Sequence, residues 1–106
     1  MGKVNIKKVI ELVNKGRCAL RLKPIEDLPK GQPGRICSCP IALALSNGWH
    51  AAVCETFASL NSAEDAASVA KTWKTKHAGN NVGLPRAISR FVRAFDENEL
   101  PQYLEQ

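Results

Sequence analysis

Three arginines in the second half of the chain lie at helical spacing and could bind successive phosphate groups. Arg86, Arg90 and Arg93 stand at positions i, i+4 and i+7, so a helix would place them on one side. A row of guanidinium groups suits an anionic macromolecule, although an ordinary solvated helix face carries similar charge. Lysines near the end of the preceding predicted helix, at positions 71, 74 and 76, would extend the row if the two helices are neighbours. The predicted partner-binding residues are Arg86, Arg90, Arg93, Lys71 and Lys74.

A second group of side chains could bind a metal ion or supply a reactive thiol. Cys37, Cys39, His50 and Cys54 together offer three sulfurs and one nitrogen, a ligand set that zinc accepts. The C-x-C spacing is tighter than usual zinc pairs, whereas the H-x3-C spacing is acceptable. The first two cysteines also precede a predicted helix, whose N-terminus would stabilise a thiolate. Burial as small apolar side chains is the third interpretation, and the usual burial of cysteine favours it.

Other catalytic arrangements are missing from the sequence. Glu26 and Asp27 are adjacent in a loop, where acids are usually solvated. There is no phosphate-binding loop, G-x-G-x-x-G, H-E-x-x-H or nucleophile elbow. Exposed aromatics, the usual companions of single-strand binding, are also not expected, because Trp73, Phe91 and Phe95 fall on apolar stripes. The sequence therefore favours a non-enzymatic protein.

Length and composition indicate a globular protein with a basic body. The chain has 106 residues, 44% of them hydrophobic, and a net charge of +5. We expect one domain over residues 1–106, with charges of +6 in residues 1–36, +3 in 37–94 and −4 in an acidic tail at 96–106. No apolar run approaches a membrane span, and the N-terminus has no long apolar secretory segment. We therefore expect a cytoplasmic protein that does not bind a membrane.

The first third of the chain predicts a helix, a strand and a loop. Ile6–Lys15 has apolar residues at i, i+3, i+4 and i+7, with Asn5 as a cap and Gly16 as a terminator. Residues 17–23 alternate in polarity, which is typical of a half-buried strand. Residues 24–35 contain three prolines and two glycines and predict a loop.

The middle of the chain predicts a short helix and a strand. Residues 37–48 form a helix capped by Ser38 or Cys39, with Pro40 in the first turn and Gly48 after the end. Residues 49–60 are ambiguous, because both strand and helix would group Trp49, Val53 and Phe57. The length favours the strand, with 49–58 pairing antiparallel with 17–23.

Two more helices and a short final turn complete the prediction. Ser62 opens the first, which buries alanines, Val69 and Trp73. Residues 77–83 connect it to the helix of the arginine row, Leu84–Phe95, and Pro101 opens the final turn. The expected core is Val9, Ile10, Val13, Leu20, Leu45, Val53, Phe57, Val69, Trp73, Ile88, Phe91, Val92 and Phe95.

These elements make a small α+β domain in which about four helices pack on a two- or three-stranded antiparallel sheet. The function that fits best is an accessory module that binds a macromolecule, protein or nucleic acid, through the basic helix face. The alternative is a zinc- or thiol-dependent protein that uses the Cys-Ser-Cys-Pro segment at 37–40. Oligomeric state and partner identity do not follow from the sequence.

Overall fold

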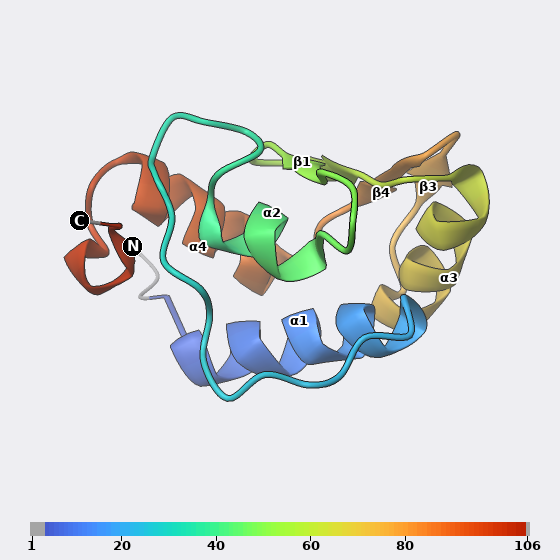
Figure 1. Ribbon diagram of the computed structural model, residues 1–106, viewed down its shortest axis with the longest axis horizontal. Coiled ribbons are helices and arrows are strands. Elements are labelled where there is room, and N and C mark those ends of the chain that lie inside the picture. Colours follow the sequence, from blue (N-terminus) through green and yellow to red (C-terminus); the bar gives the residue numbers. More distant parts are fainter. Residues whose placement is uncertain (1–3, 106) are drawn as a thin grey trace.

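In the part of the chain that the structure describes, four helices surround one hydrophobic core beneath a small antiparallel sheet (Figure 1). The computed structural model describes residues 4–105. The elements in chain order are α1 (Ile6–Ala19), α2 (Pro40–Leu45), β1 (Ala52–Val53), β2 (Phe57–Ser59), α3 (Ala63–Trp73), β3 (His77–Ala78), β4 (Asn81–Gly83), α4 (Arg86–Asp96) and the 3-10 turn η1 (Pro101–Tyr103). The α+β prediction is confirmed, with four strands instead of two or three.

Helix α4 has the predicted arrangement of buried and exposed sides. The four stripe residues Ile88, Phe91, Val92 and Phe95 are buried, at 0 to 1% exposure. The Phe91 and Phe95 rings stack with centroids 6.2 Å apart, and Tyr103 of η1 meets Phe91 edge-on at 5.5 Å. Because this stripe enters the core, the arginines between its members must face solvent.

The predicted strand at residues 17–23 is wrong. Helix α1 continues through Gly16 to Ala19, and the chain then turns at Arg21, whose φ is 65°. Two hydrogen bonds from Arg17 stabilise this arrangement, one from Nε to the carbonyl of Lys23 (2.8 Å) and one from Nη1 to that of Ala44 (2.6 Å). The alternation in polarity therefore reflects a helix end and a turn.

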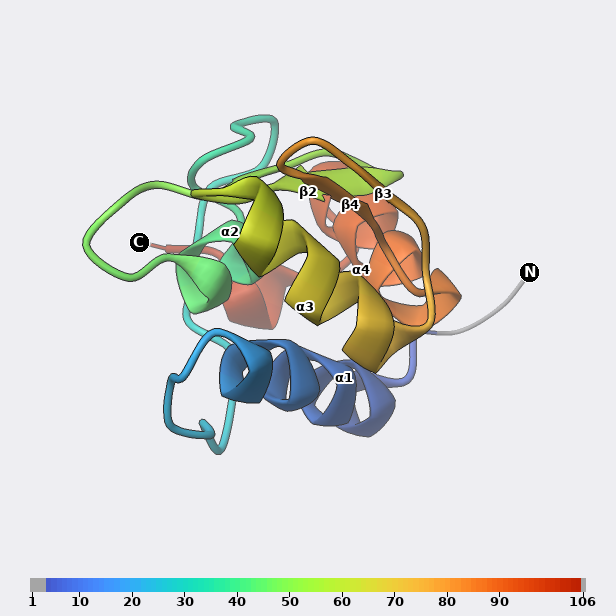
Figure 2. The ribbon, with the colours of Figure 1, turned by 90° about the vertical axis from the view of Figure 1, so that its right-hand side faces the viewer.

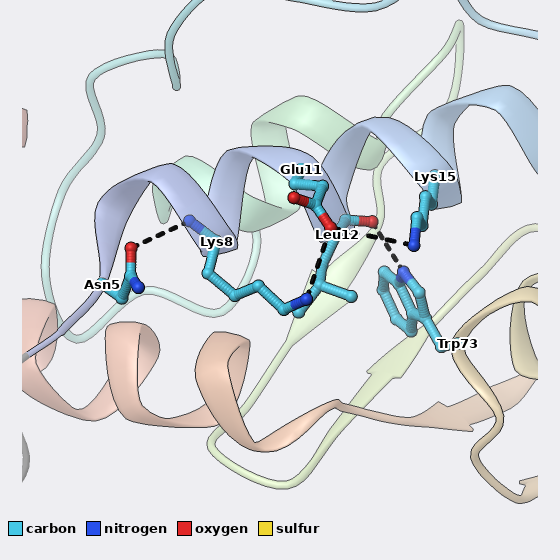
Figure 3. Close-up of polar contacts among 6 residues, drawn as sticks. All are labelled: Asn5, Lys8, Glu11, Leu12, Lys15 and Trp73. Carbon is cyan, nitrogen blue, oxygen red and sulfur yellow. Dashed lines mark hydrogen bonds and ion pairs between the residues drawn. The ribbon is translucent and has the colours of Figure 1, made fainter.

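Gly16 is a packing position and not a helix terminator. A Cβ atom there would lie 2.8 Å from Cζ2 of Trp73, so glycine allows the indole of α3 to approach α1 closely. The indole Nε1 donates to the carbonyl of Leu12 at 2.7 Å (Figure 3). The ring thus joins α3 to α1, which also packs against α2 and α4.

The strand predicted at 49–58 is two short strands joined by a turn. Val53 pairs with Ala58, and the N–H of Cys54 donates to the carbonyl of Phe57 at 3.0 Å. Because the chain reverses between these residues, Phe57 lies on the opposite face from Val53. Its side chain is 40% exposed, so its predicted place in the core is wrong; Ile10 and Leu20 are half-buried.

The remaining strand pairings are one long-range contact and one local hairpin. Strand β2 pairs with β4 and not with 17–23, and the predicted connection at 77–83 is the β3–β4 hairpin. The sheet order is β1-β2-β4-β3. Residues 24–35 form the predicted loop, and Gly31 of this loop bridges to Leu104 beside η1. No helix within residues 4–105 has the length and apolarity needed to cross a lipid bilayer.

Candidate functional site

Basic side chains without acidic neighbours follow one continuous stretch of the chain. Residues 66–95 contain six lysines and arginines and no aspartate or glutamate. This stretch makes most of α3, the β3–β4 hairpin, which packs against α3, and α4 up to its last residue (Figure 2). All six side chains are exposed. They are Lys71, Lys74, Lys76, Arg86, Arg90 and Arg93.

Backbone contacts bring the end of α3 close to the start of α4. The N–H of Gly83 donates to the carbonyl of Lys76 at 2.8 Å, and Arg86 follows Gly83 by three residues. Helices α3 and α4 each pack on α1. The β3–β4 hairpin therefore connects the lysines near the end of α3 to the first arginines of α4, whereas α3 and α4 share at most a small direct contact.

Arg93 differs from the other cations because it has acidic partners. Its Nε lies 3.9 Å from Glu55 and 3.7 Å from Glu97. The turn that carries Glu55 is held against α4 by two hydrogen bonds, from the hydroxyl of Ser89 to the carbonyl of Glu55 (2.5 Å) and from the N–H of Leu84 to that of Thr56 (3.0 Å). Arg93 therefore contributes less free charge than the other predicted binding residues.

The other five cations of this stretch make no ion pair with any residue in the described range 4–105. The lysines of α1 provide the contrast, since Lys8 and Lys15 lie 3.3 and 3.8 Å from Glu11 (Figure 3). We call Lys71, Lys74, Lys76, Arg86 and Arg90 the basic side.

The acidic tail lies at the other end of α4 from Arg86. Asp96 accepts a hydrogen bond from the N–H of Gly34 at 3.1 Å, and Glu105 donates its N–H to the carbonyl of Gly31 at 2.9 Å. At a helical rise of about 1.5 Å per residue, Asp96 is about 15 Å from Arg86 along the axis. This exceeds the Debye length of about 8 Å at physiological salt, so the tail does little to neutralise Arg86.

The four candidate metal ligands do not form a common site. No group of three or more histidine, cysteine, aspartate or glutamate side chains within residues 4–105 is arranged to hold a metal ion. Cys37 and His50 are exposed, Cys54 is half-buried and Cys39 is buried. All four cysteines of the chain, including Cys18, are free thiols.

Cys39 caps helix α2 instead of facing solvent. Its sulfur accepts a hydrogen bond from the N–H of Ala42 at 3.4 Å, and Pro40 occupies the first helical position as predicted. Burial raises the pKa of the Cys39 thiol above its ordinary value, against the lowering effect of hydrogen bonds from the Ala42 and Ile41 N–H groups. A raised pKa disfavours the thiolate, so these features favour a capping and packing role.

The pKa of the Cys54 thiol is shifted in the opposite direction from that of Cys39. Partial burial raises its pKa, but hydrogen bonds from the backbone of Thr56 and Phe57 and from the Thr56 hydroxyl outweigh this effect, so the pKa of Cys54 lies below its ordinary value. The sulfur is 3.6 Å from the Thr56 hydroxyl. Cys54 belongs to no group of three or more potential metal ligands within residues 4–105, and its contact with Thr56 places it in the β1–β2 turn.

Phe57 is the residue that sequence reasoning missed. The sequence predicts Phe57 in the core, whereas its side chain is 40% exposed in the structure. The available signal was Glu55, which interrupts the apolar face of the supposed long strand at the position where the chain turns.

Comparison with known proteins adds no family assignment. The chain matches no protein-family model, no curated protein and no solved structure.

Proposed function

We propose that this protein is a small non-enzymatic cytoplasmic module that binds an anionic macromolecule through the basic side. The observation that carries the proposal is the set of five exposed cations without ion-pair partners in residues 4–105, on a stretch of thirty residues that contains no acid. Clustered cations of this kind attract polyanions and bind phosphates with release of counterions. Four free thiols are compatible with a reducing cytoplasm.

The position of Arg86 supports a binding role because it is unfavourable for folding. Arg86 is the first residue of α4, whose first turn has no acidic residue and whose cap makes no side-chain hydrogen bond. A cation at a helix N-terminus opposes the helix dipole, and like charges four residues apart, as at Arg86 and Arg90, destabilise a helix. Residues that break local rules of stability are often found at functional sites.

Binding of a labelled DNA duplex and a labelled single strand, measured by fluorescence anisotropy between about 50 and 200 mM salt, tests this proposal. We expect the affinity of the unmodified protein to fall steeply with salt. The double variant Arg86→Gln/Arg90→Gln should bind more weakly, with the slope of log K against log salt reduced by about 1.5, because each lost phosphate contact contributes about 0.7 to 0.9.

The matched control is Lys23→Gln/Lys30→Gln. It removes the same charge from exposed lysines in and beside the 24–35 loop and should leave the slope nearly unchanged. Equal weakening by both double variants would show that net charge, and not the basic side, drives binding. Absence of salt-dependent binding to either DNA would overturn the proposal.

A further inference from the structure

The sheet has one covered face and one uncovered face. Val53, Ala58 and Val82 point to the helices and are buried, at 2, 0 and 0% exposure. The helices of residues 4–105 lie on this side of the sheet (Figure 1). Because side chains alternate along a strand, the neighbours of these three residues form the other face. We call it the outer face.

Phe57 lies within a row of side chains that crosses the outer face. It pairs with Gly83, Cys54 donates its N–H to the Phe57 carbonyl, and Gly83 donates its N–H to the carbonyl of Lys76. The order of the row is therefore Cys54, Phe57, Gly83 and Lys76. Gly83 contributes no side chain between Phe57 and Lys76, and the nearest side-chain atom to a Cβ built at Gly83 is Cβ of Thr75, at 3.6 Å.

The next row contains only small side chains. Ala52, Ser59, Asn81 and Ala78 are register partners across the four strands, and the Ser59 hydroxyl donates to Oδ1 of Asn81 at 2.5 Å. Phe57 is thus the one large apolar side chain in these two rows. Protein–protein interfaces depend on several buried anchors at their centre, and these two rows contain only one large apolar side chain.

Two cations of the basic side lie on or next to the strands of the outer face. Lys76 is two strand spacings from Phe57, about 10 Å, and Arg86 follows the end of β4 by three residues. The nearest acid along the row is Glu55, which already lies beside Arg93 at 3.9 Å. An aromatic ring on an open surface with cations at its border is the arrangement by which proteins stack bases and bind the phosphates between them.

We propose that single-stranded nucleic acid binds across the outer face, with a base stacked on Phe57 and its phosphates at Lys76 and Arg86. This inference rests on the proposed function of the basic side and adds the chemical class of the ligand. A duplex buries its base faces within its own stack and cannot use Phe57, so single strands of RNA or DNA should bind more tightly than a duplex of equal length.

The test compares Phe57→Ala and Phe57→Trp for binding to labelled single-stranded oligouridylate, oligothymidylate and a duplex. We expect Phe57→Ala to weaken both single strands about tenfold or more, without changing the salt slope, since no phosphate contact is lost. Duplex binding should be unaffected. Phe57→Trp, which keeps a stacking ring, should retain the affinity of the unmodified protein. The two single strands show whether the 2′-hydroxyl matters.

Leu43→Ala is the matched control, because Leu43 is a similarly exposed apolar side chain (36%) on α2 and its loss should change nothing. Unchanged single-strand binding in Phe57→Ala, together with weaker binding in Arg86→Gln/Arg90→Gln, would overturn this inference and leave the proposed function standing. Equal affinity for duplex and single strand would also overturn the inference without affecting the proposed function. If no nucleic acid binds at low salt, both fail. Should Phe57→Ala unfold, weak binding by folded Phe57→Trp would still overturn the inference.

Discussion

The two ends of α4 differ in what their polar groups contact. At the C-terminal end, Asp96 binds the N–H of Gly34, and the segment after the helix exchanges backbone hydrogen bonds with Gly31. At the N-terminal end, Arg86 and Arg90 face solvent and make no ion pair within the described residues. We call the contact between the 24–35 loop and residues 96–105 the loop–tail contact.

This difference separates groups that stabilise the fold from groups that are available to a partner. Changes in the loop–tail contact should lower the free energy of unfolding and leave nucleic-acid binding by the folded protein unchanged. Changes in the basic side should weaken nucleic-acid binding and leave the free energy of unfolding nearly unchanged. The following three substitutions test this separation, from the largest expected effect on stability to the smallest.

Gly31→Ala should have the largest effect. A Cβ atom at this position would collide with the backbone carbonyl of Ser38 and lie 3.0 Å from the nitrogen of Pro40. Backbone atoms cannot rotate away, so the loop must shift and weaken its hydrogen bonds to Tyr103 and Glu105. We expect a loss of about 3 kcal/mol in the free energy of unfolding, measured by urea denaturation.

Gly79→Ala is the control for this substitution. Gly79 has open space around it and a φ of 58°, so alanine there meets only the backbone cost of about 1 to 2 kcal/mol. If Gly31→Ala costs no more than Gly79→Ala, the loop accommodates the methyl group and the loop–tail contact is less rigid than described.

Tyr103→Phe should have a smaller effect that depends on pH. The hydroxyl of Tyr103 donates to Oδ1 of Asp27 at 2.8 Å, and burial, this hydrogen bond and the carboxylate charge raise its pKa from 10 to about 12. Removing the hydroxyl leaves the Asp27 carboxylate without this donor, and we expect a loss of about 1 to 2 kcal/mol at neutral pH. Binding to nucleic acid should not change.

The sign of the pH dependence follows from the raised pKa. Between about pH 10 and pH 12 the unfolded tyrosine loses its proton while the folded one retains it, so stability falls as pH rises. Tyr103→Phe should lack this component. Tyr103 is the single tyrosine of the chain, so its phenolate absorbance reports the folded pKa directly. A midpoint near 10 would contradict the proposed contact with Asp27.

The features that were predictable from the sequence depend on residues close together in the chain. The apolar stripe of α4, the Ser62 cap of α3, which accepts from the N–H of Asp65 at 3.1 Å, and Pro40 at the start of α2 each follow from a few neighbouring residues. Local spacing is enough for such signals.

The features that were missed depend on contacts between distant segments. The role of Gly16 is defined by Trp73, far along the chain. Strands of two or three residues are too short to show a period, so their partners could not be inferred. The face of Phe57 depends on the position of one turn, because a shift by one residue moves every side chain to the other face. The exposure of the cations on α3 and α4 was predictable from helical spacing, whereas the exposure of Phe57 was not.

The smallest effect on stability, with the opposite sign, is expected from Arg86→Gln/Arg90→Gln. Removing a cation from the first turn of α4 relieves its opposition to the helix dipole, and removing the pair relieves repulsion four residues apart. Each effect is worth only tenths of a kcal/mol, so we expect a stabilisation of about 0.5 kcal/mol in urea denaturation at low salt, and less at high salt.

Arg93→Gln is the matched control on the same helix, because it removes ion pairs with Glu55 and Glu97 and should instead cost up to about 0.5 kcal/mol. Destabilisation by the double variant would mean that these arginines support the fold, and the separation between the two ends of α4 would fail.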